Sequence, residues 1–270
     1  MKISFIGGGN MATALISGLA GTFTAGTNIH VVDPNPATLA KLVQQFGVTS
    51  AARIDARVAR SDVIVLAVKP QQMRDVAAHL QPQVTTQLVL SIAAGIRAQD
   101  LSRWLGGHAA IVRCMPNTPA LIDQGITGMV ALPGVSAAQH DAANSIMQAV
   151  GSTVWLDEET QIDAVTAVSG SGPAYVFYFI EAMQQAAQEL GLSAEQGSQL
   201  AIATFVGAAQ LAAQSIDPVA VLRERVTSKG GTTYAALTSM DASGVKDRII
   251  GAVKAAALRS RELGEEMGRD

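Results

Sequence analysis

A segment late in the 270-residue chain carries the residue types best suited to chemistry. Residues 226–233 read Val-Thr-Ser-Lys-Gly-Gly-Thr-Thr, so two adjacent glycines lie among four hydroxyl side chains. Without Cβ atoms, the glycine N–H groups can turn towards a ligand and be approached closely, and the hydroxyls add further donors. The segment is therefore typical of an anion-binding loop, although clusters of Gly, Ser and Thr also form ordinary linkers between helices.

A second candidate site lies at the beginning of the chain. The residues Gly7-Gly8-Gly9-Asn10-Met11-Ala12 fit the pattern G-x-G-x-x-A. The first glycine permits a tight turn, and the second lets a pyrophosphate approach a helix N-terminus, where free N–H groups and the helix dipole favour an anion. Because an apolar run precedes this turn and an amphipathic stretch follows it, we predict a dinucleotide cofactor here.

The cofactor preference depends on Asp33, which closes the next apolar run 24 residues after Gly9. An acid there usually accepts hydrogen bonds from the adenosine ribose of NAD and repels the 2′-phosphate of NADP. Asp33 could equally cap the helix that starts at Pro36, and a phosphate could be reached by Lys41, Arg53 or Arg57. Spacing alone therefore leaves NADPH and NADH both open.

Three further segments follow predicted strands. Ala67-Val68-Lys69-Pro70 and Ser91-Ile92-Ala93-Ala94-Gly95 lie at carboxyl ends, the edge of an open α/β sheet where ligands bind. Lys69 either contacts a ligand there or is a solvated charge. In Arg113–Ala120, two prolines fix the loop and Asn117 offers donors and acceptors to a nicotinamide or a small substrate. Cys114 has no histidine near it in sequence, so we expect a buried small hydrophobic residue.

The elements that position these segments change in character near Trp155. Before it, apolar runs alternate with amphipathic stretches, which predicts βαβ units and a mostly parallel sheet. After it, helical patterns predominate. We predict a dinucleotide-binding α/β domain over residues 1–156 and an all-α domain over 157–270. Expected strands lie at 2–6, 29–32, 63–68, 88–92, 110–112, 128–132 and 153–156. Expected helices lie at 11–19, 36–46, 73–80, 162–190 (interrupted at 169–173), 194–214, 218–225 and 245–263.

Composition excludes several functional classes. A net charge of −3 without a long basic run argues against nucleic acid as a partner. One cysteine and four scattered histidines predict neither an internal disulfide nor a metal site. No apolar run reaches about 18 residues and no signal-like segment precedes the first strand, so we expect no membrane span and a cytoplasmic protein. Alanine-rich helices with weak charge favour a buried intersubunit core and hence at least a dimer.

Together, six segments resemble the pyrroline-5-carboxylate reductase family, in the same order along nearly the whole chain. They are Phe5–Met11, Ala67–Pro70, Ser91–Gly95, Met115–Ala120, Ser169–Tyr175 and Val226–Thr233. The last is the most specific, because many dehydrogenases share the glycine-rich nucleotide turn. The resemblance implies reduction of Δ1-pyrroline-5-carboxylate to L-proline with NADPH or NADH, the last step of proline biosynthesis. It also implies an N-terminal Rossmann domain and a helical C-terminal dimerisation domain, in a homodimer or a higher oligomer of dimers.

The resemblance also implies roles for individual residues. Cofactor contacts are expected at Ile6, Gly7, Gly8, Gly9, Asn10, Met11, Asp33, Ala67, Val68, Lys69, Pro70, Ile92, Ala93 and Ala94. The substrate carboxylate is expected at Ser228, Gly230, Gly231, Thr232 and Thr233, with Asn117 near the reacting centre and Glu159 at the pocket's edge. Thr233, nearest the ring nitrogen, is the implied catalytic residue. The family usually has proline where this chain has Lys229, which loosens the loop and places a cation near the carboxylate.

The implied chemistry demands little acid–base catalysis. A protonated cyclic imine is already electrophilic, so the protein must orient it against the hydride donor, neutralise its carboxylate and exclude water. A weak hydroxyl donor such as that of Thr233 suffices to hold or supply the nitrogen proton.

Three alternatives remain beside this reading. A β-hydroxyacid dehydrogenase typically carries a lysine base on its inter-domain helix, and no lysine lies between Ile162 and Leu190. A non-catalytic dinucleotide-binding sensor would not need the loop at 226–233. The third alternative is a reductase of another cyclic or acyclic imine. The sequence alone does not distinguish it from a pyrroline-5-carboxylate reductase.

Overall fold

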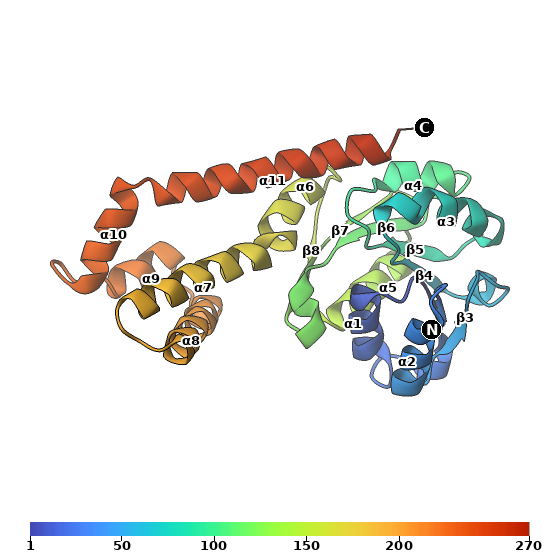
Figure 1. The fold of residues 1–270 in the computed structure, drawn as a ribbon. Helices are drawn as coiled ribbons and strands as arrows, with labels where there is room; N and C mark the ends of the chain where they lie inside the picture. Colours follow the sequence, from blue (N-terminus) through green and yellow to red (C-terminus); the bar gives the residue numbers. More distant parts are fainter. Residues whose placement is uncertain (270) are drawn as a thin grey trace. The chain divides into compact units, whose positions relative to one another are not determined.

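The computed structural model describes residues 1–269, which form two compact units (Figure 1). The first comprises Met1–Ser171 together with the chain from Ala256 onward, and the second comprises Gly172–Ala255. The last strand of the sheet ends at Trp155, next to the predicted domain boundary at 156, whereas the first compact unit continues to Ser171. The domain limits 1–156 and 157–270 stay a prediction.

The first unit is built on an eight-stranded sheet in the order β3-β2-β1-β4-β5-β6-β7-β8. Four strands are buried at every position, as expected of parallel strands covered on both faces: β1 (Ile3–Ile6), β2 (Ile29–Val32), β4 (Val63–Leu66) and β5 (Leu88–Ser91). The others are β3 (Thr49–Ala51), β6 (Ile111–Met115), β7 (Gly125–Ala131) and β8 (Gly151–Trp155). Only the β6–β7 pairing is antiparallel among these described strands, so the mostly parallel sheet is confirmed.

Helices cover both faces of this sheet (Figure 1), and the sheet separates the apolar core into two layers. In β4, Val63 and Val65 join the apolar cluster that includes residues of α1 (Asn10–Leu19), α2 (Pro36–Phe46) and α5 (Ala137–Gln148). Ile64 and Leu66 join the opposite cluster with α3 (Met73–Leu80) and α4 (Ala98–Trp104). Because alternate residues of a strand face opposite sides, a fully apolar strand supports both layers.

The strand order fixes where a ligand can bind. The chain runs from β1 outward to β2 and β3 and then returns to β4 on the other side of β1, so the strand order reverses there and the sheet has its switch point at β1 and β4. In doubly wound sheets, ligands bind outside the carboxyl ends of the strands at such a point. The glycine turn after β1 lies at this position.

The predicted interruption of the helix over 162–190 is confirmed. An α-helix, α6 (Gln161–Val165), passes into a π-helical turn, Thr166–Gly170, before α7 (Gly172–Glu189) begins. The N–H of Ser171 donates to the carbonyl of Thr166 at 2.8 Å, five residues back. Pro173 lies in the first turn of α7, where its missing N–H costs no intrahelical hydrogen bond.

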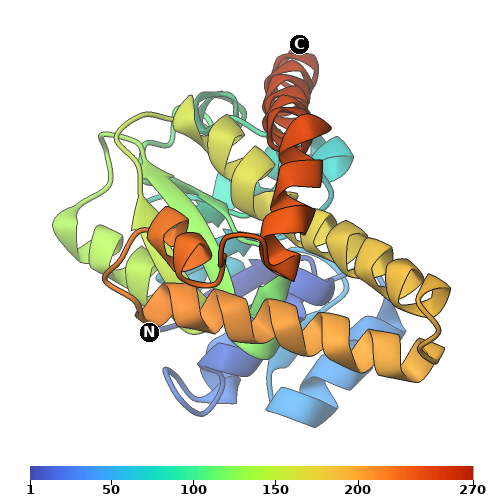
Figure 2. The ribbon, with the colours of Figure 1, turned by 90° about the vertical axis from the view of Figure 1, so that its left-hand side faces the viewer.

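The second unit is entirely helical in its described part. It contains α7, α8 (Ala194–Gln214), α9 (Val219–Arg225), α10 (Thr232–Ala242) and the beginning of α11 (Val245–Met267). α7 and α8 run side by side (Figures 1 and 2), and Gly197 brings them close because a Cβ there would lie 3.0 Å from that of Ala187. Large apolar side chains remain exposed over this unit, including Leu190, Leu211 and Ile216. No described helix combines the length and the apolar character that a membrane span requires.

Candidate active site

The turn after β1 has the geometry of a dinucleotide-binding loop. Gly7 has φ +102°, and a Cβ there would lie 2.6 Å from the carbonyl oxygen of Ala67 on the adjacent strand end, so no larger residue fits. Gly9 is the N-cap residue of α1, and a Cβ there would meet no described atom within 4 Å. The space beside Gly9 is therefore open to a ligand at the free N–H groups of α1.

Asp33 stabilises this turn through hydrogen bonds to the backbone. Its Oδ2 accepts a hydrogen bond from the N–H of Gly8 at 2.8 Å, and its Oδ1 accepts one from the N–H of Asn35 at 2.8 Å. The N-cap of α2 is Asn35, whose Oδ1 accepts from the N–H of Ala37 at 3.0 Å. The alternative that Asp33 caps this helix is therefore wrong, because the residue two positions later takes that role.

A cavity of about 810 Å³ opens beside the turn, at the carboxyl ends of β1, β2 and β4. That volume lies within the range of small-molecule and cofactor sites, roughly 300–1,000 Å³. The residues that line it are Ile6, Gly7, Gly9, Val32, Asp33, Pro34, Ala52, Arg53, Ile54, Ala67, Val68, Lys69, Gln72, Asp75, Val76 and His79. The lining thus includes Ile6, Gly7, Gly9, Asp33, Ala67, Val68 and Lys69 from the predicted cofactor set.

The other predicted cofactor residues do not line this cavity. Gly8 is buried and bonded to Asp33, while Asn10 and Met11 begin α1. Pro70 starts a short 3₁₀ turn after Lys69. Ile92, Ala93 and Ala94 follow β5, with Ala93 buried in the core and Ala94 exposed.

Lys41, Arg53 and Arg57 were the predicted candidates to reach a ribose phosphate, and the fold places them in different surroundings. Arg53 lines the large cavity. Arg57 instead lines a different cavity, and Lys41 is an exposed residue of α2 that lines neither of the two. Sequence reasoning missed the cavity residues of α3 and of the turn before it, among them Gln72 and Val76. Nothing in their spacing indicates a ligand-binding site.

The end of β6 carries a network of buried polar residues. Nη1 of the buried Arg113 donates to Oε1 of Glu159 at 2.8 Å. The same oxygen accepts the N–H of Ala98, at the start of α4, at 2.6 Å. Glu159 therefore ties the segment before α6 to the sheet and to α4.

Asn117 and Cys114 lie on the same strand end. Asn117 is buried, and its Oδ1 accepts the N–H of Ile126 on β7 at 2.9 Å, so its amide oxygen is engaged inside the protein. Cys114 is 1% exposed, and burial raises the pKa of its thiol. The expectation of a buried small hydrophobic residue at Cys114 is confirmed.

The glycine–hydroxyl segment begins a helix. The N–H of Gly231 donates to the carbonyl of Ser228 at 3.0 Å, and Gly230 adopts φ +75°. Gly231 is the N-cap of α10 and offers no side-chain acceptor, so the N–H groups of Thr232 and Thr233 have no acceptor within the helix. Ser228 and Lys229 are exposed, and Thr233 is half-buried. The segment joins α9 to α10 and at the same time presents an array of donors.

Comparison with known proteins identifies the family. A family model described as "Pyrroline-5-carboxylate reductase dimerisation" matches residues 159–263, and one described as "NADP oxidoreductase coenzyme F420-dependent" matches residues 2–95. A pyrroline-5-carboxylate reductase of Pseudomonas aeruginosa is 48% identical over 269 residues, which is 99% of this chain and 98% of the relative. The chain belongs to the pyrroline-5-carboxylate reductase family.

Solved structures of the pyrroline-5-carboxylate reductase family have the same fold. The enzyme from Coxiella burnetii is 40% identical with a TM-score of 0.91, over 97% of this chain and 98% of that one. The enzyme from Plasmodium falciparum, solved with NADP bound, is 29% identical with a TM-score of 0.87, over 98% of each chain.

More distant structures share the fold alone. A 3-hydroxyisobutyrate dehydrogenase from Mycobacterium tuberculosis is 16% identical with a TM-score of 0.52, over 71% of this chain and 66% of that one. An imine reductase from Streptomyces aurantiacus is 15% identical with a TM-score of 0.57, over 100% of this chain and 96% of that one. The comparisons therefore favour the pyrroline-5-carboxylate reductases over both rival classes.

Proposed function

We propose that this chain reduces Δ1-pyrroline-5-carboxylate to L-proline by hydride transfer from NADPH. The observation that carries the proposal is the 48% identity to a pyrroline-5-carboxylate reductase over 99% of the chain. The open N-terminus of α10, with the unpaired N–H groups of Thr232 and Thr233, supports the substrate assignment because it suits a carboxylate.

The large cavity of the first unit suits the cofactor. Gly9 leaves room for a pyrophosphate against the N-terminus of α1, and Arg53 offers a cation where a ribose phosphate would lie. When bound, the reduced nicotinamide supplies the hydride. The turn from Gly7 to Met11 would hold the pyrophosphate at the N-terminus of α1, where the N–H groups of Asn10 and Met11 are the donors because that of Gly8 bonds to Asp33. Ala67 to Pro70 and Ile92 to Ala94 are the further proposed cofactor residues. The NADP-bound relative and the NADP oxidoreductase match favour NADPH over NADH.

The substrate side depends on neutral donors. The N–H groups of Thr232 and Thr233 and the Ser228 hydroxyl bind the carboxylate beside Gly230 and Gly231, and the Lys229 ammonium adds positive charge. The Thr233 hydroxyl holds the ring nitrogen with its proton. Hydride addition to the imine carbon then converts the C=N bond to a C–N single bond, and the proton stays on nitrogen to give the secondary amine. Asn117 and Glu159, which hold loops of the first unit through their hydrogen bonds, are the further proposed substrate residues.

Self-association accompanies this function. The match to a dimerisation model over 159–263 and the exposed apolar residues of the second unit support a homodimer. Assembly of dimers into a higher oligomer, and a cytoplasmic location, stay predictions.

Nicotinamide absorbance during incubation with pyrroline-5-carboxylate tests the proposal. We expect rapid oxidation of NADPH, slower oxidation of NADH, and a fall in kcat/KM of at least about tenfold for Thr233→Ala, since one hydrogen bond to a charged group contributes about 1.5–3 kcal/mol. Thr238→Ala, an exposed position later on α10, is the matched control and retains full activity. A folded protein that binds NADPH but does not oxidise it in the presence of this imine contradicts the proposal.

A further inference from the structure

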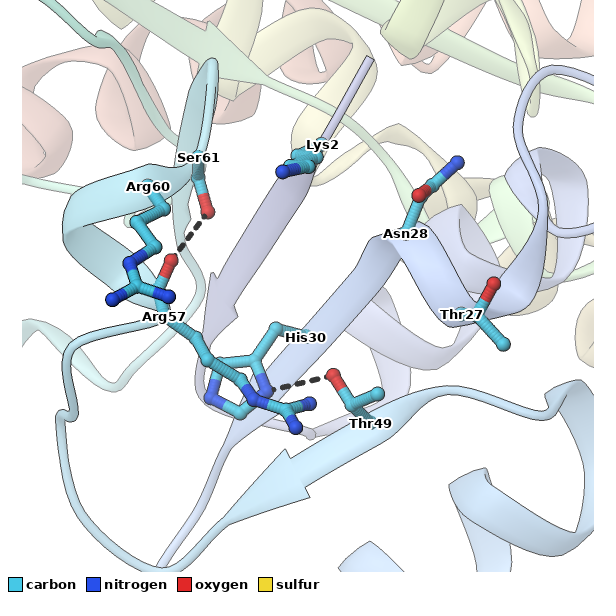
Figure 3. Close-up of a pocket in the computed structure, with 8 residues that line it drawn as sticks. All are labelled: Lys2, Thr27, Asn28, His30, Thr49, Arg57, Arg60 and Ser61. Carbon is cyan, nitrogen blue, oxygen red and sulfur yellow. Dashed lines mark hydrogen bonds between the residues drawn. The ribbon is translucent and has the colours of Figure 1, made fainter.

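A second cavity in the first unit lies at the amino ends of β1 and β2, the edge of the sheet opposite the dinucleotide cavity (Figure 3). Its volume is about 190 Å³. One water needs only about 10–15 Å³, so a polyatomic ion with several waters can enter. The walls come from the starts of β1 and β2, from β3, and from the short 3₁₀ turn Val58–Arg60 with its flanking residues.

Three basic side chains line this cavity: Lys2, Arg57 and Arg60. Among residues 1–269, none of the three forms an ion pair within 4.0 Å. Two carboxylates are near, but both are engaged by backbone: Asp55 accepts the N–H of Arg57 at 2.9 Å, and Asp62 accepts the N–H of Lys2 at 2.7 Å. Both carboxylates keep their charge, but neither pairs with the three basic side chains, which stay available to an anion.

A buried histidine also lines this cavity. The His30 side chain is 6% exposed, and its Nδ1 lies 2.9 Å from the Thr49 hydroxyl. Its Nε2 faces Asp55 Oδ1 at 3.2 Å. His30 therefore forms part of the polar wall of the cavity, together with Thr49.

We propose that this cavity binds a phosphate-sized oxyanion, either free phosphate or the phosphate group of a small metabolite. Arginine guanidinium groups donate parallel hydrogen bonds to phosphate oxygens, and lysine adds a point charge. The side chains of Thr27 and Asn28 supply neutral donors around the same space, whereas the Ser61 hydroxyl donates to the Arg57 carbonyl at 3.3 Å. This site is independent of the dinucleotide cavity and of the proposed reductase activity.

Calorimetric titration of the full-length protein with inorganic phosphate, at constant ionic strength in chloride, tests the site. We expect saturable binding that is weakened at least tenfold in the double variant R57Q/R60Q. Arg53→Gln is the matched control, since it removes an arginine from the dinucleotide cavity, and it retains the wild-type phosphate affinity. Thermal unfolding in chloride establishes that both variants are folded.

The variants also locate any binding that is observed. Phosphate affinity that falls in Arg53→Gln and persists in R57Q/R60Q places the ion in the dinucleotide cavity and overturns the proposal, as does the absence of saturable binding. Because the readout is binding, its failure is distinct from a failure of reductase activity.

A parallel titration with glycerol 3-phosphate distinguishes free phosphate from a phosphorylated metabolite as the ligand. Tighter binding of this monoester than of inorganic phosphate assigns the site to a phosphorylated metabolite. Equal or weaker binding assigns it to free phosphate. In either case the R57Q/R60Q variant must lose the interaction for the proposal to stand.

Discussion

Arg113 and Glu159, 46 residues apart in sequence, form a largely buried ion pair with 2.8 Å between Nη1 and Oε1. The arginine side chain is 5% exposed and the carboxylate side chain 23%. Since the same Oε1 accepts the N–H of Ala98, one carboxylate fixes β6, α4 and the segment leading to α6. Glu159 therefore has a structural role whether or not it also contacts substrate.

Glu159→Ala tests that role. The change leaves Arg113 buried and unpaired, so we expect the free energy of unfolding to fall by about 3 kcal/mol, the lower end of the range for breaking a buried pair. Chemical denaturation measures this loss, and the exposed neighbour variant Glu158→Ala should change stability by less than about 0.5 kcal/mol. An unchanged stability with a raised KM for the imine would instead make Glu159 purely a substrate ligand.

The glycine turn offers a contrast between Gly7 and Gly9, two positions on either side of Gly8. Gly9→Ala adds a methyl group where no described protein atom lies within 4 Å, so we expect a loss of stability below about 1 kcal/mol. The methyl group occupies the space proposed for the pyrophosphate, and NADPH affinity should fall at least about tenfold. Fluorescence titration with NADPH measures this effect.

Gly7→Ala is the counterpart, because its Cβ meets the Ala67 carbonyl and its φ is +102°. We expect it to reduce the free energy of unfolding by more than about 2 kcal/mol. Wild-type NADPH affinity in Gly9→Ala would show that the cofactor does not approach this turn.

Arg53 provides the test of cofactor preference. Both oxygens of Asp33 already accept backbone N–H groups, and Arg53 lines the same cavity. Arg53→Gln should lower kcat/KM for NADPH about 10- to 100-fold, the effect of one charge-assisted hydrogen bond, while kcat/KM for NADH changes less than about twofold. Lys41→Gln, outside the cavity, should leave both values unchanged. An equal fall for both cofactors would mean that Arg53 does not contact the 2′-phosphate.

Substitutions at Lys229, where the family resemblance implies proline, distinguish the effect of charge from that of loop stiffness. Lys229→Ala removes only the cation, whereas Lys229→Pro also fixes φ. For an exposed charge contributing up to about 1 kcal/mol, we expect both variants to raise KM for the imine up to about fivefold. Only the proline variant should gain stability, by about 0.4–1 kcal/mol, measured by thermal unfolding. Unchanged KM in both would show that the ammonium group does not reach the carboxylate.

His30 predicts a pH dependence of stability. Burial lowers its pKa below the ordinary value of 6.5, and the charge of Arg57 acts in the same direction, while Asp55 opposes them. Below about pH 6.5 the unfolded chain therefore binds a proton that the native state resists, and stability falls as the pH is lowered. His30→Gln should reduce the fall in Tm between pH 7 and pH 5, whereas the exposed His140→Gln should not. Identical slopes in all three proteins would contradict this assignment.

Where a local pattern fixes an element, the sequence predicts its bounds well. The helices at 36–46, 73–80 and 194–214 have the predicted limits. α2 begins with an Asn-Pro cap and ends at Gly47 in the left-handed conformation. α8 begins with a capping box of Ser193 and Gln196. Apolar runs on both faces likewise identified the central parallel strands.

Elements without such a pattern escaped prediction. β3 has three partly exposed residues, Thr-Ser-Ala, and therefore lacks an apolar run. α10 starts at Thr232, directly after the N-cap residue Gly231. Glycine and threonine favour a loop, so this helix start was not predicted. α4 and α5 were also not predicted.

The candidate site was likewise predicted where a local motif indicates it and missed where it depends on tertiary contacts. The glycine turn is a local motif and was found from sequence. The contacts Asp33–Gly8 and Arg113–Glu159 join residues 25 and 46 positions apart, and no periodicity indicates which polar groups the fold brings together.

The first compact unit is discontinuous along the chain, since it includes the end of α11. Ser260 Oγ donates to Asp163 Oδ1 at 2.7 Å, Arg97 pairs with Glu265 at 3.7 Å, and Arg103 donates to the carbonyl of Gly268 at 2.9 Å. These contacts need residues that follow the whole of the second unit along the chain. During synthesis, the first unit can therefore be completed only after residues 172–255 have been made, although most of it emerges earlier.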